Sequence, residues 1–115
     1  ARALYGPTAA DAVIGTIPYM APEQLRERRY TEAGDVYSLG VSIFELIAGR
    51  RPFTGRDLET QRLEILGKPA PALSSLVPEV PVRLDVLVGR MLAKQPRERP
   101  HSMGEIRHGQ RLSDG

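Results

Sequence analysis

One stretch of the chain stands out in its distribution of apolar residues. From Asp35 to Ala48, apolar side chains recur at three- and four-residue spacing, which predicts a helix. They are Val36, Leu39, Gly40, Ile43, Phe44 and Ile47 on one face, with Val41, Leu46 and Ala48 on the others. Because apolar groups lie nearly all round it, we expect this helix to be central and buried on most sides. Thr31 is a suitable N-cap, and Gly49 is a suitable stop.

Two more helices are predicted further along the chain. The first covers about residues 57–66 and has Leu58, Ile65 and Leu66 as its apolar contacts. The second covers about residues 81–93, and its apolar face is Leu84, Leu87, Val88, Met91 and Leu92. The stretch between them, residues 67–81, is rich in proline and predicts a loop. A short last helix is expected from Ser102, where a capping-box pattern begins. No segment alternates as a strand would, so the predicted fold class is mainly α.

The first 22 residues form the least regular part of the sequence. Glycine and proline interrupt any helical or strand period there. Long loops without secondary structure are uncommon in compact domains and are often functional. The N-terminal segment is therefore the first place to look for activity.

Composition narrows the classes of function. The chain has 115 residues, with 16 Lys and Arg against 14 Asp and Glu, and thus a net charge of only +2. This balance gives no reason to expect nucleic-acid binding. No apolar run approaches the roughly 20 residues that span a bilayer, so we expect no membrane contact from this segment and a cytoplasmic location. There is no cysteine, and no spacing of His, Asp or Glu suggests a metal site.

Four motifs in order resemble the later part of the protein kinase catalytic domain. Residues 15–23 read Gly-Thr-Ile-Pro-Tyr-Met-Ala-Pro-Glu, which resembles the end of the kinase activation segment with its Ala-Pro-Glu triplet. Residues 35–41, Asp-Val-Tyr-Ser-Leu-Gly-Val, resemble the start of the family's central helix. Pro52-Phe53 follows that helix, and residues 96–100, Pro-Arg-Glu-Arg-Pro, resemble a late family motif. One such match is weak, but four at the family's spacing are specific to serine/threonine kinases, here of a bacterial type.

The resemblance implies a particular place within the kinase fold. The chain would be the C-terminal lobe portion of a parent domain that is α+β. Residues 1–23 would be the activation segment and substrate-binding loop, and residues 24–115 the helical lobe. The chain begins without Met, and its opening residues resemble those that come directly after the Asp-Phe-Gly motif in such kinases. The parts that bind ATP and Mg²⁺ would then lie upstream, and we expect the isolated chain to bind neither and to be inactive.

The resemblance also assigns roles in substrate binding and regulation. The parent would transfer the ATP γ-phosphate to Ser or Thr of protein substrates, with Mg²⁺. Gly15, Thr16, Ile17, Pro18 and Tyr19 would form the substrate-binding floor, with no catalytic residue in this chain itself. Thr16 would contact the catalytic aspartate upstream. Ile17 departs from the commoner form, in which proline directly follows the threonine, and this leaves substrate preference open.

Other matched residues would be structural or regulatory. Glu23 and Arg99 would form a buried ion pair, since Arg can donate two parallel hydrogen bonds to a carboxylate. Asp35 would cap backbone amides of the upstream catalytic loop, or else stabilise the first turn of its own helix. Thr8 is the candidate for activating phosphorylation, ahead of Tyr5, although it could be only a polar loop residue.

Two other interpretations of the sequence remain open. The parent could be a noncatalytic pseudokinase or helical scaffold that binds partners through the same helices. It could also be an unrelated helical binding module in which the motifs are coincidental. Nothing separates a docking role from a core role for the apolar residues 58–66, and the basic cluster 26–29 contains an acidic residue, as a solvated face would.

Overall fold

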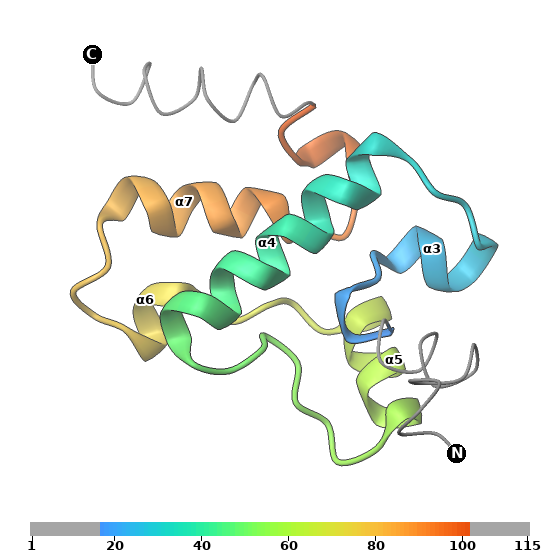
Figure 1. Cartoon of the computed structure of the whole chain (residues 1–115), viewed down its shortest axis with the longest axis horizontal. Coiled ribbons are helices and arrows are strands. Elements are labelled where there is room, and N and C mark those ends of the chain that lie inside the picture. The colour runs from blue at the N-terminus through green and yellow to red at the C-terminus, as the bar shows by residue number, and fades with distance from the viewer. Residues whose placement is uncertain (1–16, 102–115) are drawn as a thin grey trace, which may run out of the picture.

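The computed structural model describes residues 17–101, and all regular elements in that range are helical (Figure 1). The elements are the short 3₁₀ turn η1 (Ile17–Tyr19), α3 (Pro22–Glu27), α4 (Glu32–Ala48), α5 (Leu58–Gly67), α6 (Leu73–Leu76), α7 (Val82–Met91) and the 3₁₀ turn η2 (Pro96–Glu98). Helix α4 crosses the middle of the molecule, and α7, α6 and η1 pack against it. The mainly α prediction is therefore confirmed for the described residues.

Helix α4 is bounded by the two residues that the sequence indicated. The Thr31 side chain accepts a hydrogen bond of 3.1 Å from the Gly34 amide, as an N-cap does. At the other end Gly49 takes a left-handed conformation, with φ of 75°, and its amide donates to the Glu45 carbonyl. The helix begins three residues before the predicted Asp35, because the apolar pattern starts only after the first turn.

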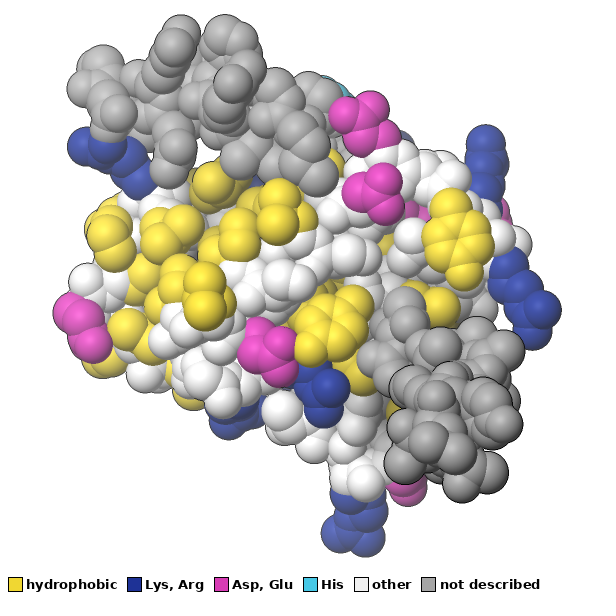
Figure 2. Space-filling view, viewed as in Figure 1, with side chains coloured by type: hydrophobic (Ala, Val, Ile, Leu, Met, Phe, Trp, Pro, Cys, Tyr) yellow, Lys and Arg dark blue, Asp and Glu magenta, His cyan; other side chains and the backbone are white. Residues whose placement is uncertain are grey.

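The expectation that α4 is buried on most sides is wrong. Its buried side chains follow one stripe, Val36, Tyr37, Val41 and Phe44. Leu46 is 84% exposed and Leu39 is also exposed, although both are leucines. Figure 2 shows apolar side chains gathered on the surface over α4 and α7. Apolar content alone does not tell which face of a helix the rest of the molecule covers.

The later helices match the prediction with one addition. Helix α5 begins after Asp57, whose carboxylate accepts a hydrogen bond of 2.7 Å from the Thr60 amide. Helix α7 ends two residues before the predicted Ala93. The predicted loop of residues 67–81 contains the single turn α6, because Leu73 is buried in the core and the Asp85 carboxylate accepts a hydrogen bond of 3.2 Å from the Ser74 amide. The predicted helix from Ser102 lies outside the described residues.

The core is formed where α4 meets the other elements. Phe44, Tyr37 and Val41 of α4 belong to one cluster with residues from α5, α6, α7 and the connections. The other buried members are Ala21, Phe53, Ile65, Leu73, Val80, Val88 and Leu92. Gly40 lies at the contact with α7, where an added Cβ would stand 2.8 Å from the Met91 Cβ. A glycine at this position thus lets the two helices approach closely.

Within residues 17–101, none of the helices combines the length and the apolar character that crossing a bilayer requires.

Candidate functional site

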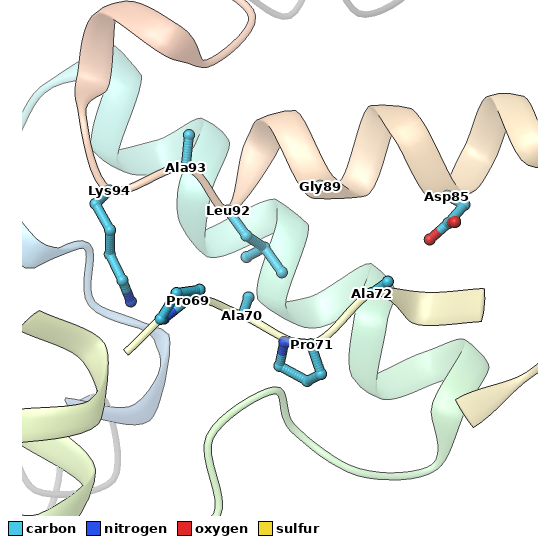
Figure 3. A pocket seen from close by; sticks show the side chains of 9 residues that line it. All are labelled: Pro69, Ala70, Pro71, Ala72, Asp85, Gly89, Leu92, Ala93 and Lys94. Atoms are coloured by element: carbon cyan, nitrogen blue, oxygen red, sulfur yellow. The ribbon is translucent and has the colours of Figure 1, made fainter. Parts of the chain in front are cut away.

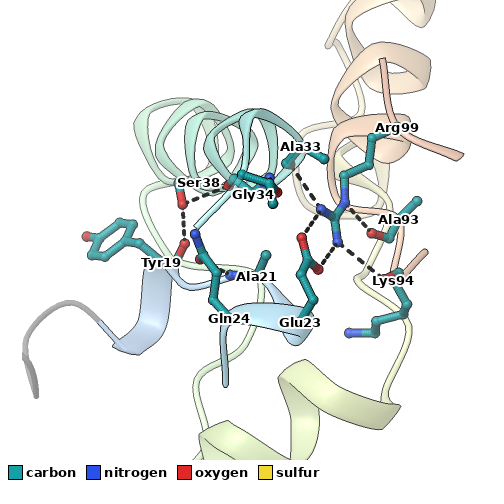
Figure 4. A network of polar contacts seen from close by, with 11 residues as sticks. Tyr19, Ala21, Glu23, Gln24, Ala33, Gly34, Ser38, Ala93, Lys94 and Arg99 are labelled. Atoms are coloured by element: carbon teal, nitrogen blue, oxygen red, sulfur yellow. Dashed lines mark hydrogen bonds and ion pairs between the residues drawn. The ribbon is translucent and has the colours of Figure 1, made fainter. Parts of the chain in front are cut away.

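Helix α3 places Glu23 at the centre of the candidate site. The sequence pattern predicted no helix here, since the segment is short and follows an irregular stretch. Pro22 occupies the first helical position, where its missing N–H costs nothing. The Gln24 side chain accepts a hydrogen bond of 2.8 Å from the Ala21 amide, which supports the start of the helix. The first turn therefore presents the Glu23 carboxylate toward the C-terminal part of the chain (Figure 4).

Glu23 and Arg99 form a buried, two-point ion pair. The Arg99 Nη1 donates to Glu23 Oε2 at 2.7 Å, and Nη2 donates to Oε1 at 2.8 Å. The Arg99 side chain is fully buried, and Glu23 is nearly so. The structure thus brings together two residues 76 positions apart that the motif pattern had linked. Parallel bonds of this kind fix geometry as well as charge.

Arg99 uses its remaining donors on backbone carbonyls. Its Nε donates to the Ala93 carbonyl at 2.8 Å, Nη1 to the Ala33 carbonyl at 3.0 Å, and Nη2 to the Lys94 carbonyl at 3.2 Å. With the two bonds to Glu23, all five N–H groups of the guanidinium are satisfied. One side chain therefore joins α3, the first turn of α4 and the connection between α7 and η2.

The charge balance of this pair makes the carboxylate more acidic. Burial alone would raise the pKa of Glu23, but the hydrogen bonds from Arg99 and from backbone, with the positive charges of Arg99 and Arg26, outweigh it. The net result is a Glu23 pKa below its ordinary value. The folded state therefore holds Glu23 ionised at pH values where an unfolded chain would begin to protonate it.

This shift predicts how stability changes in acid. The contribution of Glu23 is complete above the ordinary glutamate pKa of about 4.3, and it is lost as the pH falls through the lower folded value. We expect the unfolding free energy of the native chain to fall steeply below about pH 4. A Glu23→Gln variant, less stable at neutral pH, should show a shallower fall. Denaturant titrations at several pH values check this, and equal slopes for the two proteins would contradict it.

Tyr37 contributes a ring but not its hydroxyl to this region. The Arg99 guanidinium lies 5.1 Å from the centre of the Tyr37 ring, within the range of a cation–π contact. The hydroxyl is buried and has no hydrogen-bond partner among the described residues. Burial also raises the pKa of Tyr37 above its ordinary value, so the group stays neutral.

Tyr37→Phe is therefore expected to stabilise the fold. Phenylalanine keeps the ring beside Arg99 and removes a buried hydroxyl without a partner, so the free energy of unfolding should rise by about 1 kcal/mol. Chemical denaturation followed by circular dichroism measures the change. A loss of stability in this variant would show that the hydroxyl has a partner that stabilises the fold.

The segment just before α3 is tied to the central helix. The Ser38 hydroxyl donates to the Tyr19 carbonyl at 2.6 Å, and the Tyr19 hydroxyl donates to Glu45 Oε1 at 2.7 Å. The hydrogen bond to Glu45 raises the pKa of Tyr19, with burial acting in the same direction. Two turns of α4 thus hold η1 through the backbone and the side chain of Tyr19.

The predicted site residues are distributed as follows. Ile17, Pro18 and Tyr19 form η1, with Pro18 buried. Gly15, Thr16, Thr8 and Tyr5 lie outside the described residues. Asp35 is exposed in the first turn of α4.

Several residues of the site were not found from the sequence. Gln24, at the third helical position after Ala21, had a local signal, because a glutamine there is typical of a capping box. Ser38 and Glu45 had none, because their partners lie 19 and 26 positions away. Among residues 17–101, no group of three or more His, Cys, Asp or Glu side chains could hold a metal ion. The described arrangement can hold and orient a chain segment, and it presents no metal centre of its own.

Comparison with known proteins agrees with the motifs. The family model described as "Protein kinase domain" matches residues 1–109. The chain is 38% identical over 101 residues to the serine/threonine-protein kinase Pkn1 of Myxococcus xanthus. This match covers 88% of this chain and 15% of Pkn1. It is 35% identical over 92 residues to PknL of Mycobacterium tuberculosis, covering 80% of this chain and 23% of that kinase. It is 34% identical over 92 residues to PrkC of Bacillus subtilis, covering 80% of this chain and 14% of that kinase. The chain therefore spans less than a quarter of the length of these relatives.

Proposed function

This chain belongs to the protein kinase domain family, and on that basis we propose that it forms the helical part of the C-terminal lobe of a serine/threonine protein kinase. The whole protein would transfer the γ-phosphate of ATP to Ser or Thr side chains of protein substrates in the cytoplasm. Residues 1–23 would be the activation segment and substrate-binding loop, and residues 24–115 the helical lobe below it. The similarity to serine/threonine kinases of three bacteria supports this assignment.

The observation that carries the proposal is the Glu23–Arg99 ion pair. It joins the Ala-Pro-Glu triplet to the Pro-Arg-Glu-Arg-Pro motif, and these two motifs were the most separated parts of the kinase resemblance. Because Arg99 also bonds three carbonyls, α3 has a fixed position relative to α4. Such an anchor suits a segment that must receive a peptide in one register, since phosphoryl transfer depends mainly on positioning.

The substrate-binding role rests on the attachment of η1. Ser38 and Glu45 of the central helix hold Tyr19, and Pro18 is buried. A peptide lying over η1 would thus rest on a backbone that α4 supports. Thr16 would contact the catalytic aspartate of the upstream loop, and Thr8 would be the activating phosphorylation site.

ATP and Mg²⁺ would be supplied and bound elsewhere in the parent protein. ATP provides the phosphoryl group, and Mg²⁺ offsets its negative charge in such reactions. Mg²⁺ in such sites is usually held by one or two carboxylates together with the phosphates of ATP, and residues 17–101 contain no group of three or more His, Cys, Asp or Glu that could hold a metal ion.

Phosphate transfer is tested with the protein at its full length. The protein is incubated with γ-labelled ATP, Mg²⁺ and a Ser- and Thr-rich protein substrate, and labelled residues are identified by mass spectrometry. We expect label on Ser and Thr, and its loss in a Thr16→Ala variant that keeps native helix content. The 115-residue chain alone should show neither transfer nor tight ATP binding.

Two results would overturn the assignment. A folded full-length protein that binds partners but transfers no phosphate would indicate a noncatalytic scaffold. Transfer by the 115-residue chain alone, above the level of its own Thr16→Ala variant, would show that the chemistry does not need upstream parts.

A further inference from the structure

Separately from the activating site proposed at Thr8, we propose that Thr54 is a phosphorylation site and that Arg50 holds the phosphate placed on it. This inference rests on the proposed kinase function, because the donor is ATP and the acting enzyme is a second copy of the parent kinase. Thr54 is exposed and lies in the connection between α4 and α5, residues 49–57. The Arg50 Nη2 donates to the Thr54 Oγ1 at 3.4 Å, so a guanidinium stands beside the hydroxyl before any phosphate is added.

The hydroxyl groups of the described residues differ in how easily a kinase could reach them. They belong to Thr31, Ser38, Ser42, Thr54, Thr60, Ser74 and Ser75. Within residues 17–101, Thr31 and Thr54 are the two of these that lie outside the helices, and Thr31 is half-buried as the N-cap of α4. Phosphoryl transfer needs the attacking oxygen in line at about 3–3.5 Å from phosphorus. An exposed residue in an irregular backbone meets this condition most easily, and Thr54 is that residue.

Two exposed serines show the contrast. The Ser42 hydroxyl donates to the Ser38 carbonyl at 3.2 Å, and the Ser75 hydroxyl donates to the Ala72 carbonyl at 2.5 Å. Both serines lie in helices and would have to break these hydrogen bonds to react. The Thr54 oxygen instead accepts a hydrogen bond. Its own proton is not held by a carbonyl of the described part of the chain.

Positive charge surrounds Thr54 along the sequence. Residues 50–56 contain Arg50, Arg51 and Arg56 and no acidic residue. Arg50 and Arg56 are exposed. A phosphate adds a charge of about −1.5 to −2, and its oxygens accept strong hydrogen bonds from guanidinium groups. The connection can therefore hold a phosphate on Thr54 without a change of fold.

The nearest carboxylates act against a phosphate, but both have partners. The Asp57 carboxylate accepts from the Thr60 amide at 2.7 Å. Glu64 Oε1 accepts from the Gly55 amide at 2.8 Å, and Glu64 Oε2 lies 3.5 Å from the Lys68 Nζ. These contacts offset part of the negative charge, so we expect the arginines to dominate.

The backbone is anchored on both sides of Thr54. Before it, Phe53 is buried, and the Lys94 Nζ lies 4.2 Å from the centre of the Phe53 ring. Figure 3 shows the Lys94 side chain beside Pro69, at one end of a surface pocket of about 350 Å³. After it, Gly55 is held at its amide and its carbonyl by side chains of α5. A phosphate on Thr54 would therefore meet the neighbouring guanidinium in one geometry.

The transfer step is an ordinary phosphorylation by ATP. The Thr54 Oγ1 attacks the γ-phosphorus of ATP, and an O–P bond forms. The bond from that phosphorus to the oxygen shared with the β-phosphate breaks, and its electron pair leaves on ADP. The proton of the hydroxyl passes to a base of the acting kinase.

The test incubates the full-length protein with Mg²⁺, ATP and a Ser- and Thr-rich protein substrate. Phosphorylated peptides of both proteins are quantified by mass spectrometry. We expect phosphate on the substrate and on Thr54, with an occupancy on Thr54 about tenfold above that on Ser42 or Ser75.

The role of Arg50 is measured on the phosphorylated protein with a serine/threonine phosphatase. We expect the phosphate on Thr54 to be removed about threefold faster in an Arg50→Gln variant, since an exposed charge pair would be lost. Arg62→Gln is the matched control, because Arg62 is also largely exposed but pairs with Glu59. Its rate should equal that of the native protein.

The outcomes separate this inference from the proposed kinase function. Phosphate on the substrate without preferential phosphate on Thr54 overturns the inference and leaves the kinase function standing. Phosphate on neither protein overturns both. Equal rates of phosphate removal in the native protein and in Arg50→Gln overturn the part assigned to Arg50.

Discussion

Replacing Glu23 with alanine is expected to lower the free energy of unfolding by about 3–5 kcal/mol. The reason is that Arg99 is fully buried and would keep its charge without the carboxylate that balances it. Two of its five hydrogen bonds would also be lost, in a place that water cannot easily reach. Urea denaturation followed by circular dichroism measures the effect. In the parent protein, the same change should also weaken phosphate transfer, because α3 would no longer be fixed to α4.

A matched control is available on the surface. Glu59 pairs with Arg62 through two hydrogen bonds on α5, and both side chains are largely exposed. Exposed pairs contribute little, so Glu59→Ala should leave stability nearly unchanged. If the two alanine variants unfolded at the same urea concentration, the Glu23–Arg99 ion pair would not stabilise the fold more than an exposed pair does.

The second large effect is expected at Gly40. A side chain there would meet the Met91 Cβ at 2.8 Å and the Leu92 Cδ2 at 3.2 Å. Met91 is fully buried, and its Cβ is bonded directly to the backbone of α7. This atom therefore cannot move unless α7 shifts. Gly40→Val should therefore lower the free energy of unfolding by about 3 kcal/mol, as overpacking of a core contact does. Thermal unfolding or urea denaturation measures it.

Gly89 supplies the comparison for this variant. It also lies within a helix, α7, but an added Cβ would meet nothing within 4 Å. Gly89→Val should change stability by only a few tenths of a kcal/mol, since valine is slightly better than glycine in a helix. A similar loss for both valine variants would show that the close contact between α4 and α7 at Gly40 does not set the cost.

The central helix and its ends could be predicted because their causes are local. Thr31 and Gly49 act on neighbouring backbone groups, and the apolar spacing of α4 repeats within the helix itself. The single turn α6 could not be predicted, because it depends on Leu73 reaching the core and on Asp85, 11 positions from Ser74. The exposure of Leu46 also depends on tertiary packing, because apolar spacing does not tell which sides of a helix the rest of the molecule covers.

The candidate site was likewise predicted only in part. The order of the kinase motifs predicted the ion pair between Glu23 and Arg99. No property of either local sequence connects the two residues. The attachment of Tyr19 to Ser38 and Glu45 was not indicated by those motifs. It depends on how η1 lies across α4, which is settled only when the helices pack.

The separation of 76 positions between Glu23 and Arg99 also has a consequence for synthesis on the ribosome. At usual translation speeds, Arg99 is made roughly 4 to 15 seconds after Glu23. During that interval the Glu23 carboxylate lacks its buried partner, and α3 lacks the hydrogen bonds through which Arg99 fixes it to α4. Arg99, which is translated later, therefore completes the attachment of the earlier helix α3.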